Sequence, residues 1–267
     1  MMKSVVSWIR RRGGPKILVA AIAWAATGAD PTSKLGSIMK SVPAPIHNAS
    51  HKLWLASSSK GKLREFTQAA RARDIEVGTL PDIDRLEPCV EDGLTFEANA
   101  CKKAEYYSRH GHGLVFTDDS GIAVDLLGGA PGVFSARFSG HDATDDDNNA
   151  KLLRELRRAL HPEDVGPIES PNPRAAAHYV CVIALARQGQ VLAIAEGRAD
   201  GIIIAPPRGS GGFGYDPYFF FPPLGRTFAQ LSPEAKFAVS HRGEAFRKLL
   251  DYLERSGGAP GTIPAGA

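Results

Sequence analysis

Two acidic stretches carry the side chains that could hold a metal ion. Glu91-Asp92-Gly93 and Asp118-Asp119-Ser120-Gly121 lie on separate parts of the chain. Carboxylates on separate segments suit Mg²⁺, which takes one or two of them and completes its shell with water and phosphate oxygens. A carboxylate there could also orient or deprotonate a water molecule. Either stretch read alone would favour a solvated turn instead.

Two further groups could bind anions. Ser57-Ser58-Ser59-Lys60-Gly61-Lys62 follows a short apolar run and precedes a helical pattern. Backbone N–H groups at a helix N-terminus bind anions, and lysines add charge. The GxxxxGK[ST] phosphate-loop pattern is absent, and the stretch alone could be an ordinary serine-rich helix start. Lys236 with Ser240-His241-Arg242-Gly243 offers contacts to phosphate or to base carbonyls, or simply surface charge.

A glycine-rich stretch over residues 209–217 surrounds Phe213 and Asp216. Its glycines let the backbone approach a flat ligand closely. The ring could stack on a base, and the carboxylate could accept from base N–H edges. The alternative is a hairpin loop with a core phenylalanine. Phosphate-binding, metal-binding and base-stacking groups together indicate a nucleoside triphosphate site.

The elements that position these groups follow from hydrophobic periodicity and from turn and cap signals. Strands are expected near residues 53–56, 76–80, 114–117, 178–186, 191–198 and 202–204. Helices are expected after Ser59, over 95–110 with Thr95 as N-cap, over 145–160 with a Thr144/Asp147 capping box, from Ser232, and over 244–253. Strands that alternate with helices predict an α/β protein with a mixed central β-sheet flanked by helices. Asp118 to Gly121 are expected in a loop after their strand.

Charge and cysteine content exclude several function classes. The 267 residues are 43% hydrophobic and 23% charged, as in a typical soluble globular protein. The net charge of +3 is concentrated in residues 1–38, which carry six Lys/Arg against Asp30, so the remaining chain sums to −2. A uniformly basic nucleic-acid-binding surface is therefore not expected. Cys89, Cys101 and Cys181 show neither a disulfide framework nor a zinc-site spacing.

The ends of the chain differ from the body. Arg10-Arg11-Arg12 precedes a short apolar run over residues 17–26, which resembles a signal or transit peptide and is too short to span a bilayer. The alternative is an upstream extension, with initiation at Met39 or with a disordered tail. We expect 1–51 to be an extension and linker, 52–256 the enzyme domain, and 257–267 a flexible Gly/Pro/Ala tail.

The motifs together resemble the inosine triphosphate pyrophosphatase family. The matching stretches are Leu55-Ala56, Lys60-Gly61-Lys62-Leu63-Arg64-Glu65, Glu91 to Ala100, Thr117-Asp118-Asp119-Ser120-Gly121, Gly128 to Arg137, Gly211 to Pro217, and Ser240-His241-Arg242-Gly243. They occur in the family's order over roughly residues 53–253. The resemblance implies two lobes with an active-site cleft between them.

The resemblance also implies an activity and a set of roles. It implies hydrolysis of dITP, ITP and XTP to the monophosphate and pyrophosphate by a Mg²⁺-dependent, cytoplasmic homodimer that binds neither nucleic acid nor membrane. By position, Glu91 and Asp119 match metal ligands, Asp119 the proton acceptor, and Ser120 a substrate contact. Phosphate-side contacts match Ser57, Ser58, Ser59, Lys60, Gly61, Lys62, Asn99 and Lys103. Nucleoside contacts match Phe213, Gly214, Tyr215, Asp216, Lys236, His241 and Arg242.

Two departures keep alternatives open. Ser59 stands where the family usually has Asn, and a serine offers one hydroxyl donor there. Leu-Ala-Ser-Ser-Ser also resembles the opening of Maf-type nucleotide pyrophosphatases, which usually continue with Pro-Arg-Arg, whereas this chain continues with Lys-Gly-Lys. Phe-Gly-Tyr-Asp-Pro and Ser-His-Arg-Gly favour the inosine triphosphate group. A catalytically silent nucleotide binder is the third alternative, and the presence of Glu91 and Asp119 argues against it.

Overall fold

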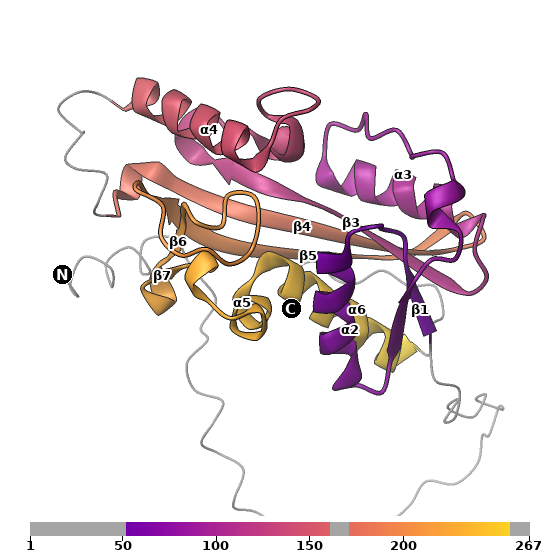
Figure 1. The fold of residues 1–267 in the computed structure, drawn as a ribbon. Helices are drawn as coiled ribbons and strands as arrows, with labels where there is room; N and C mark the ends of the chain where they lie inside the picture. The colour runs from indigo at the N-terminus through magenta and orange to yellow at the C-terminus, as the bar shows by residue number, and fades with distance from the viewer. Residues whose placement is uncertain (1–51, 161–170, 257–267) are drawn as a thin grey trace, which may run out of the picture. The chain divides into compact units, whose positions relative to one another are not determined.

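A seven-stranded mixed sheet organises the protein (Figure 1). The computed structural model describes residues 52–160 and 171–256, so the expectations for residues 1–51 and 257–267 lie outside the described residues. The strands are β1 (Lys52–Leu55), β2 (Glu76–Thr79), β3 (Leu114–Val124), β4 (Ala176–Arg187), β5 (Gln190–Ile203), β6 (Phe219–Phe221) and β7 (Arg226–Thr227), in the order β2-β1-β3-β4-β5-β6-β7. β1 runs parallel to β2 and β3, and the other neighbours are antiparallel. The predicted α/β class with a mixed sheet is confirmed.

Helices flank the sheet, as predicted. They are α2 (Lys60–Arg71), α3 (Phe96–Ser108), α4 (Asp145–Ala159), α5 (Pro233–Val239) and α6 (His241–Ser256). In Figure 1, α3 and α4 lie on one side of the long strands, and α2, α5 and α6 lie on the other. No helix in the described part of the chain is both long enough and apolar enough to cross a bilayer.

Side-chain caps start the helices where the sequence places them. Thr95 Oγ1 accepts from the N–H of Ala98 at 3.0 Å and starts α3. Thr144 and Asp147 form the expected capping box at α4, with contacts of 3.2 and 2.9 Å. Each such cap satisfies backbone N–H groups that have no partner inside the helix, and typically contributes about 1 kcal/mol.

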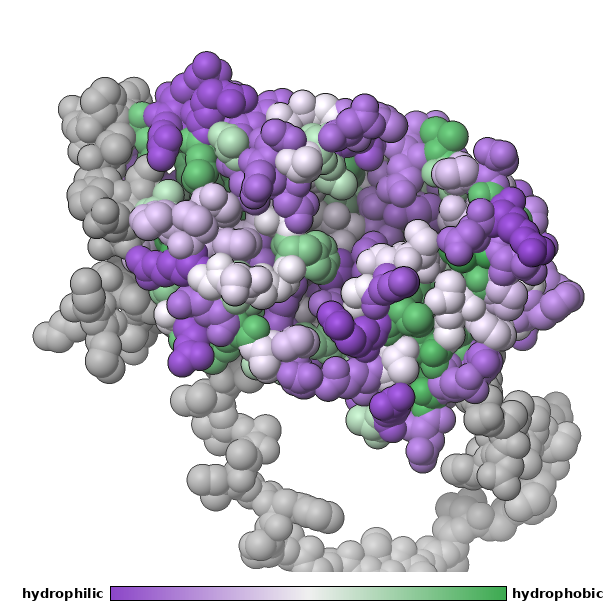
Figure 2. Space-filling model, in the orientation of Figure 1, coloured by the Kyte–Doolittle hydropathy of each residue, from purple (hydrophilic) through white to green (hydrophobic). Residues whose placement is uncertain are grey.

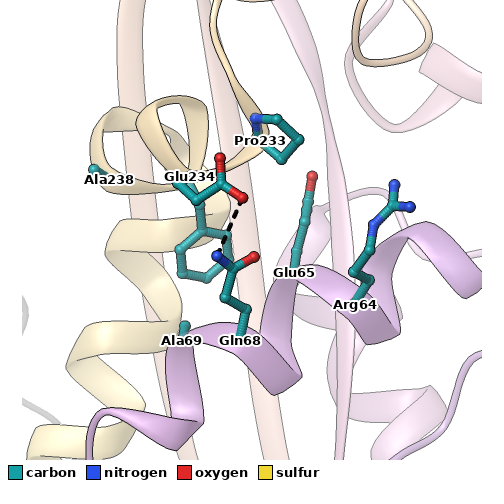
Figure 3. A pocket seen from close by; sticks show the side chains of 8 residues that line it. Arg64, Glu65, Gln68, Ala69, Pro233, Glu234 and Ala238 are labelled. Carbon is teal, nitrogen blue, oxygen red and sulfur yellow. Dashed lines mark hydrogen bonds between the residues drawn. The ribbon is translucent and has the colours of Figure 1, made fainter.

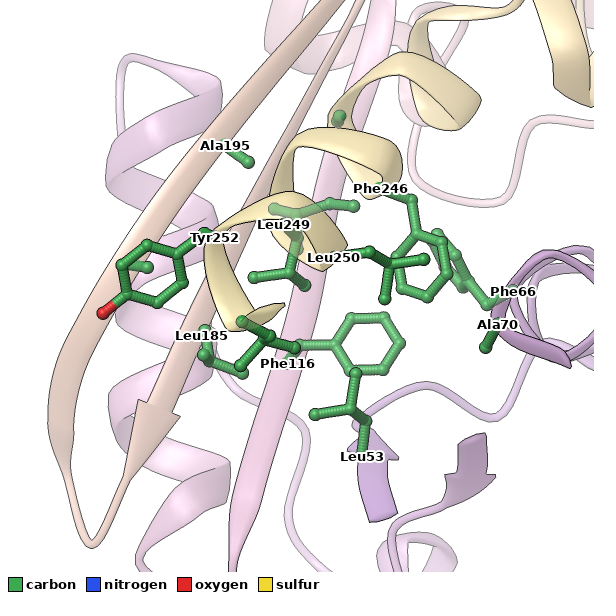
Figure 4. Packing of buried hydrophobic residues seen from close by; sticks show 14 of the residues in the cluster. Leu53, Phe66, Ala70, Phe116, Leu185, Ala195, Phe246, Leu249, Leu250 and Tyr252 are labelled. Atoms are coloured by element: carbon green, nitrogen blue, oxygen red, sulfur yellow. The ribbon is translucent and has the colours of Figure 1, made fainter. Parts of the chain in front are cut away.

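Two hydrophobic clusters occupy the two ends of the sheet. In the first, the Phe66 ring lies 5.1 Å from Phe116 and 4.7 Å from Phe246, and all three are fully buried (Figure 4). The second contains Ile122 and Phe219. Along β3, Phe116 therefore belongs to one cluster and Ile122 to the other, with polar residues between them. This arrangement fits two lobes with the site between them.

Two strand boundaries predicted from the sequence are wrong. Asp118 to Gly121 are part of β3, which continues to Val124, and 202–203 are the end of β5 rather than a separate strand. β3 continues because each of these residues pairs with β4, Asp118 with Ile183 and Gly121 with Val180. These residue types favour turns, but pairing with β4 satisfies the hydrogen bonds of their backbone groups and outweighs that local preference.

The end of β1 opens the place for the site. β1 pairs with β3 only as far as Phe116, and the Ala56 N–H donates to the Phe116 carbonyl at 2.9 Å before the chain turns into α2. Ligands of open α/β sheets bind beyond the carboxyl ends of parallel strands. The polar residues of β3 begin where this strand stops.

Figure 2 shows that the viewed face is largely hydrophilic, with hydrophobic residues in small separate groups.

Candidate active site

The serine-rich stretch forms the start of α2. Ser59 is the N-cap: its Oγ accepts from the N–H of Lys62 at 3.4 Å, and its own N–H donates to Ser57 Oγ at 3.2 Å. Ser and Asn are about equally good N-caps, so the serine keeps the helix start that an asparagine would give. Lys60 is exposed at this helix end, which is an electrostatically positive position.

Asp118 and Asp119 lie on opposite faces of β3, because successive side chains of a strand alternate. Asp118 Oδ1 lies 2.9 Å from Lys62 Nζ of α2. Asp119 Oδ1 lies 3.0 Å from Lys103 Nζ of α3. The two adjacent carboxylates are therefore held by different helices.

Lys103 stands between the two carboxylates that were predicted to bind metal. Its Nζ is 3.2 Å from Glu91 Oε2 and 3.0 Å from Asp119 Oδ1, and it also donates to the Asp118 carbonyl at 2.8 Å. Asn99 is almost fully buried and donates to Asp119 Oδ2 at 3.3 Å. Asn99 and Lys103 thus contact the carboxylates, and the phosphate contacts that the resemblance implies for them stay a prediction.

The charge of this group fits a divalent cation. Burial raises the pKa of Asp119 and the neighbouring Glu91 raises it further, while Lys103 opposes both. Two carboxylates that share one lysine leave a negative excess that a cation would relieve. Within residues 52–160 and 171–256, no group of three or more His, Cys, Asp and Glu could hold a metal. Two protein carboxylates, completed by water and phosphate, are what Mg²⁺ commonly uses.

A pocket of about 360 Å³ joins the phosphate-side residues. Its polar walls come from the end of β1, from α2, from the Glu91 segment, from α3 and from β3. They include Ser57, Ser58, Lys62, Glu91, Lys103 and Asp118. Residues predicted from four separate stretches of sequence therefore meet in one place.

Phe213 lies at the other end of the candidate site, beside the charged side chains of Lys236 and Arg242. Its side chain is 49% exposed, and its ring centroid is 4.7 Å from Lys236 Nζ and 5.4 Å from Arg242 Cζ. The ring is therefore accessible and is not a core phenylalanine. A half-exposed ring beside fixed cations can stack on a planar base.

Asp216 organises this loop from within the protein. Its Oδ2 accepts from the Phe213 N–H at 2.9 Å and is 2.5 Å from Lys236 Nζ. Burial raises the pKa of this carboxyl, and Lys236 opposes the rise. Gly212 has φ +76°, and a Cβ there would strike the Asp216 carboxylate, so glycine is required at this position.

Gly214 and Tyr215 also hold the loop. The Gly214 N–H donates to Asp145 Oδ2 at 2.6 Å, and its carbonyl accepts from Asn149 Nδ2 at 3.0 Å. The Tyr215 hydroxyl donates to the Ser135 carbonyl at 2.8 Å. The first turns of α4 therefore fix the glycine-rich loop, a role that the sequence analysis did not predict.

Arg242 connects the two halves of the site. It is 3% exposed, and its Nη1 lies 3.0 Å from Glu65 Oε2. Its Nη2 donates to Ser120 Oγ at 3.2 Å, and its Nε lies 3.5 Å from Asp118 Oδ2. The sequence analysis did not predict Glu65 or the role of Asp118. For Glu65 a signal was available, because it lies three residues after Lys62 and therefore on the same helix face.

His241 is buried against Tyr179. The two rings stack at 4.5 Å with an interplanar angle of 5°. Burial lowers the pKa of His241 well below its ordinary value, and Arg242 and Lys236 lower it further. The imidazole is therefore neutral at neutral pH, and can offer one donor and one acceptor.

A second pocket lies between α2 and α5 (Figure 3). Its lining contains none of the predicted site residues; it includes Phe237, Gln68 and Glu234, of which the last two are hydrogen-bonded at 3.2 Å. Glu65 also lines it but pairs with Arg242. The residues predicted for the phosphate side therefore line the pocket beside β1 and not this one.

The fold and the site define a nucleotide hydrolase of the α/β class. The chain belongs to the Ham1 family, whose profile matches residues 53–252. A dITP/XTP pyrophosphatase of Geobacillus kaustophilus is 44% identical over 207 residues, which cover 78% of this chain and 96% of the relative. One from Geobacter sulfurreducens is 43% identical over 202 residues, which cover 76% of this chain and 96% of the relative.

Solved structures agree with this assignment. A HAM1 protein from Coxiella burnetii has a TM-score of 0.66 and 36% identity, and the match covers 77% of this chain and 99% of that one. The Staphylococcus aureus Ham1 protein has a TM-score of 0.64 and 33% identity, with coverage of 76% and 98%.

Proposed function

We propose that this chain is a Mg²⁺-dependent pyrophosphatase that hydrolyses dITP, ITP and XTP to the nucleoside monophosphate and pyrophosphate. The observation that carries the proposal is the position of Lys103 between Glu91 and Asp119, beside a pocket walled by Ser57 and Lys62. Relatives named dITP/XTP pyrophosphatase, with over 40% identity, support it. The enzyme domain in this proposal is 52–256.

On the phosphate side, the chain supplies positioning and charge. The start of α2 and Lys62 face the pocket and would bind the triphosphate, because phosphoryl transfer needs alignment and neutralisation more than covalent chemistry. Glu91 and Asp119 would hold Mg²⁺, which when bound supplies charge neutralisation at the phosphates. Asp119 would orient the attacking water and accept its proton. Asp118 does not suit this role, because Lys62 and Arg242 hold its carboxylate as a counter-ion and its pKa is lowered.

On the base side, stacking and donor placement would select the substrate. Phe213 would stack on the purine, and donors at His241 and Arg242 would meet the 6-oxo group. A 6-amino group would leave such buried donors unpaired, at about 1–3 kcal/mol each. Two such losses are enough for roughly a hundredfold selectivity or more.

The test is pyrophosphate release from dITP with Mg²⁺, compared between wild type and Asp119→Asn. We expect release from wild type and its loss in the variant, with dITP binding retained in both. Wild-type protein that binds dITP without releasing pyrophosphate would be a silent nucleotide binder. A panel of purine and pyrimidine triphosphates separates this activity from a Maf-type base preference.

We propose further that the enzyme is a cytoplasmic homodimer. The family resemblance supports the dimer, and light scattering after size-exclusion chromatography tests it. The free thiols of Cys89, Cys101 and Cys181 suit a reducing compartment and support the location. Cell fractionation tests that part.

A further inference from the structure

The segment Cys89–Gly93, which carries Glu91, lies along α3. It belongs to neither a helix nor a strand. At one end, the Gly93 N–H donates to Asn99 Oδ1 at 2.8 Å, and the Gly93 carbonyl accepts from Asn99 Nδ2 at 3.4 Å. In the middle, Glu91 pairs with Lys103 at 3.2 Å. At the other end, the Cys89 N–H donates to the Tyr107 hydroxyl at 3.2 Å.

The three partners on α3 form one stripe. Asn99, Lys103 and Tyr107 are four residues apart, so they lie on the same face of the helix. They contact residues 93, 91 and 89 in that order, so the segment runs antiparallel to the helix. Four helical residues advance about 6 Å, and two extended residues advance about 6.6 Å. Because these two distances nearly match, the segment can make all three contacts at the same time.

Tyr107 is the third α3 residue that contacts the segment. Its hydroxyl acts on the backbone two residues before Glu91, while the ring packs in the cluster of Leu80 and Val115. We propose that Tyr107 is a positioning residue that fixes the register of the Glu91 segment on α3. It thereby places the Glu91 carboxylate beside Lys103 and opposite Asp119. This inference rests on the proposed function for its consequence in catalysis, but not for its geometry.

The variant that isolates the hydroxyl is Tyr107→Phe. It keeps the ring in its cluster and removes the acceptor of the Cys89 N–H. The matched control is Tyr106→Phe, which removes the hydroxyl of the preceding residue on the same helix. Within the described residues, the Tyr106 side chain has ring contacts but no hydrogen bond. Equal melting temperatures would establish that both variants are folded.

The first readout is amide hydrogen exchange over residues 87–94 in the full-length protein without nucleotide. Loss of one hydrogen bond should speed exchange of this segment about five- to tenfold in Tyr107→Phe and leave it unchanged in Tyr106→Phe. The second readout is Mn²⁺ binding without nucleotide, followed by electron paramagnetic resonance. Tyr107→Phe should bind Mn²⁺ several-fold more weakly than the control.

Kinetics then separate positioning from substrate contact, because Tyr107 also lines the phosphate-side pocket. A positioning role predicts a higher Mg²⁺ requirement for pyrophosphate release, with the dITP KM at saturating Mg²⁺ near wild type. Unchanged exchange and unchanged Mn²⁺ binding would overturn the proposal, whether or not the dITP KM rises. Exchange and Mn²⁺ binding involve no turnover, so a wild type that releases no pyrophosphate would refute the proposed function and leave this test intact.

Discussion

Asp118 and Asp119 are adjacent in β3, yet their carboxylates contact lysines from helices on opposite faces of the sheet. Asp118 pairs with Lys62 at 2.9 Å and Asp119 with Lys103 at 3.0 Å. Burial alone would raise the pKa of Asp118, but Lys62 and Arg242 outweigh it and hold the pKa well below its usual range. For Asp119, burial prevails and the pKa is raised. In the proposed function, the two residues therefore divide structural and chemical roles between them.

This division predicts opposite phenotypes for two isosteric changes. Asp118→Asn leaves the buried Arg242 and the half-buried Lys62 without their shared counter-ion, so it should lower the free energy of unfolding by about 3 kcal/mol. Asp119→Asn removes a carboxylate whose charge is unfavourable where it lies, so unfolding should change little while kcat falls at least a hundredfold. Urea denaturation and initial rates measure the two effects. Similar stability losses in both variants would contradict the division.

Arg242 should decide between bases. In Arg242→Ala, kcat/KM for dITP should fall far more than for dATP, because only the 6-oxo base gains from a donor there. Rates are compared under conditions in which circular dichroism shows the variant to be folded, since Glu65 and Asp118 lose a partner. Equal losses on the two substrates would assign Arg242 to structure alone.

Phe213 should contribute to binding and not to stability. Phe213→Ala removes a half-exposed ring, so the melting temperature should stay near wild type. Base stacking on an aromatic ring contributes about 1–3 kcal/mol, so the KM for dITP should rise about tenfold or more. Leu224→Ala is the matched control, because Leu224 is also about half exposed and lies outside the site. A KM that stays at the wild-type value would show that the ring does not meet the base.

Ser59 should be replaceable by asparagine but not by alanine. Ser59→Ala removes the N-cap of α2 and should cost about 1 kcal/mol of unfolding free energy, whereas Ser59→Asn should be neutral within a few tenths. Chemical denaturation of the three proteins measures this. A loss in Ser59→Asn equal to that in Ser59→Ala would mean that the Ser59 hydroxyl has another function than capping.

His241 should make the protein less stable in mild acid. Its folded pKa lies below the unfolded value, so the unfolded state binds more protons between the two values. The contribution of His241 to the free energy of unfolding is therefore fully present above about pH 6.5. It falls as the pH is lowered, by at most about 1.4 kcal/mol per pH unit. His241→Phe keeps the stack on Tyr179 and removes the titration. Unfolding free energies at pH 7.5 and 5.5 should differ less in the variant, and an equal difference would refute the assignment.

The sequence predicted the elements whose signals are local. Thr95, Thr144 and Ser232 lie at the starts of α3, α4 and α5, because a side chain that caps its own helix needs only its neighbours. The loop expected at Asp118 was wrong because β4, some sixty residues later, supplies the ladder that extends β3. The short strands β6 and β7 carry no periodicity of their own and were not predicted.

The sequence predicted which residues belong to the candidate site, but not the contacts between them. Residue types and their order indicated Glu91, Asp119, Phe213 and Arg242 as members of one site. Which carboxylate faces which lysine depends on the strand extending through Asp118, and so could not follow from a loop assignment. The contact between Tyr107 and Cys89 depends on how an irregular segment lies along a helix, which no local pattern specifies.

Asp118 is a counter-ion common to Lys62 and Arg242, which the proposed function places on the phosphate side and on the base side respectively. An anion that draws Lys62 away leaves the whole of that carboxylate to Arg242. In the proposed function, the binding free energies of the base and of the phosphates are therefore linked through this carboxylate. Free energies measured on base fragments and on pyrophosphate alone should not add up to that of the intact nucleotide.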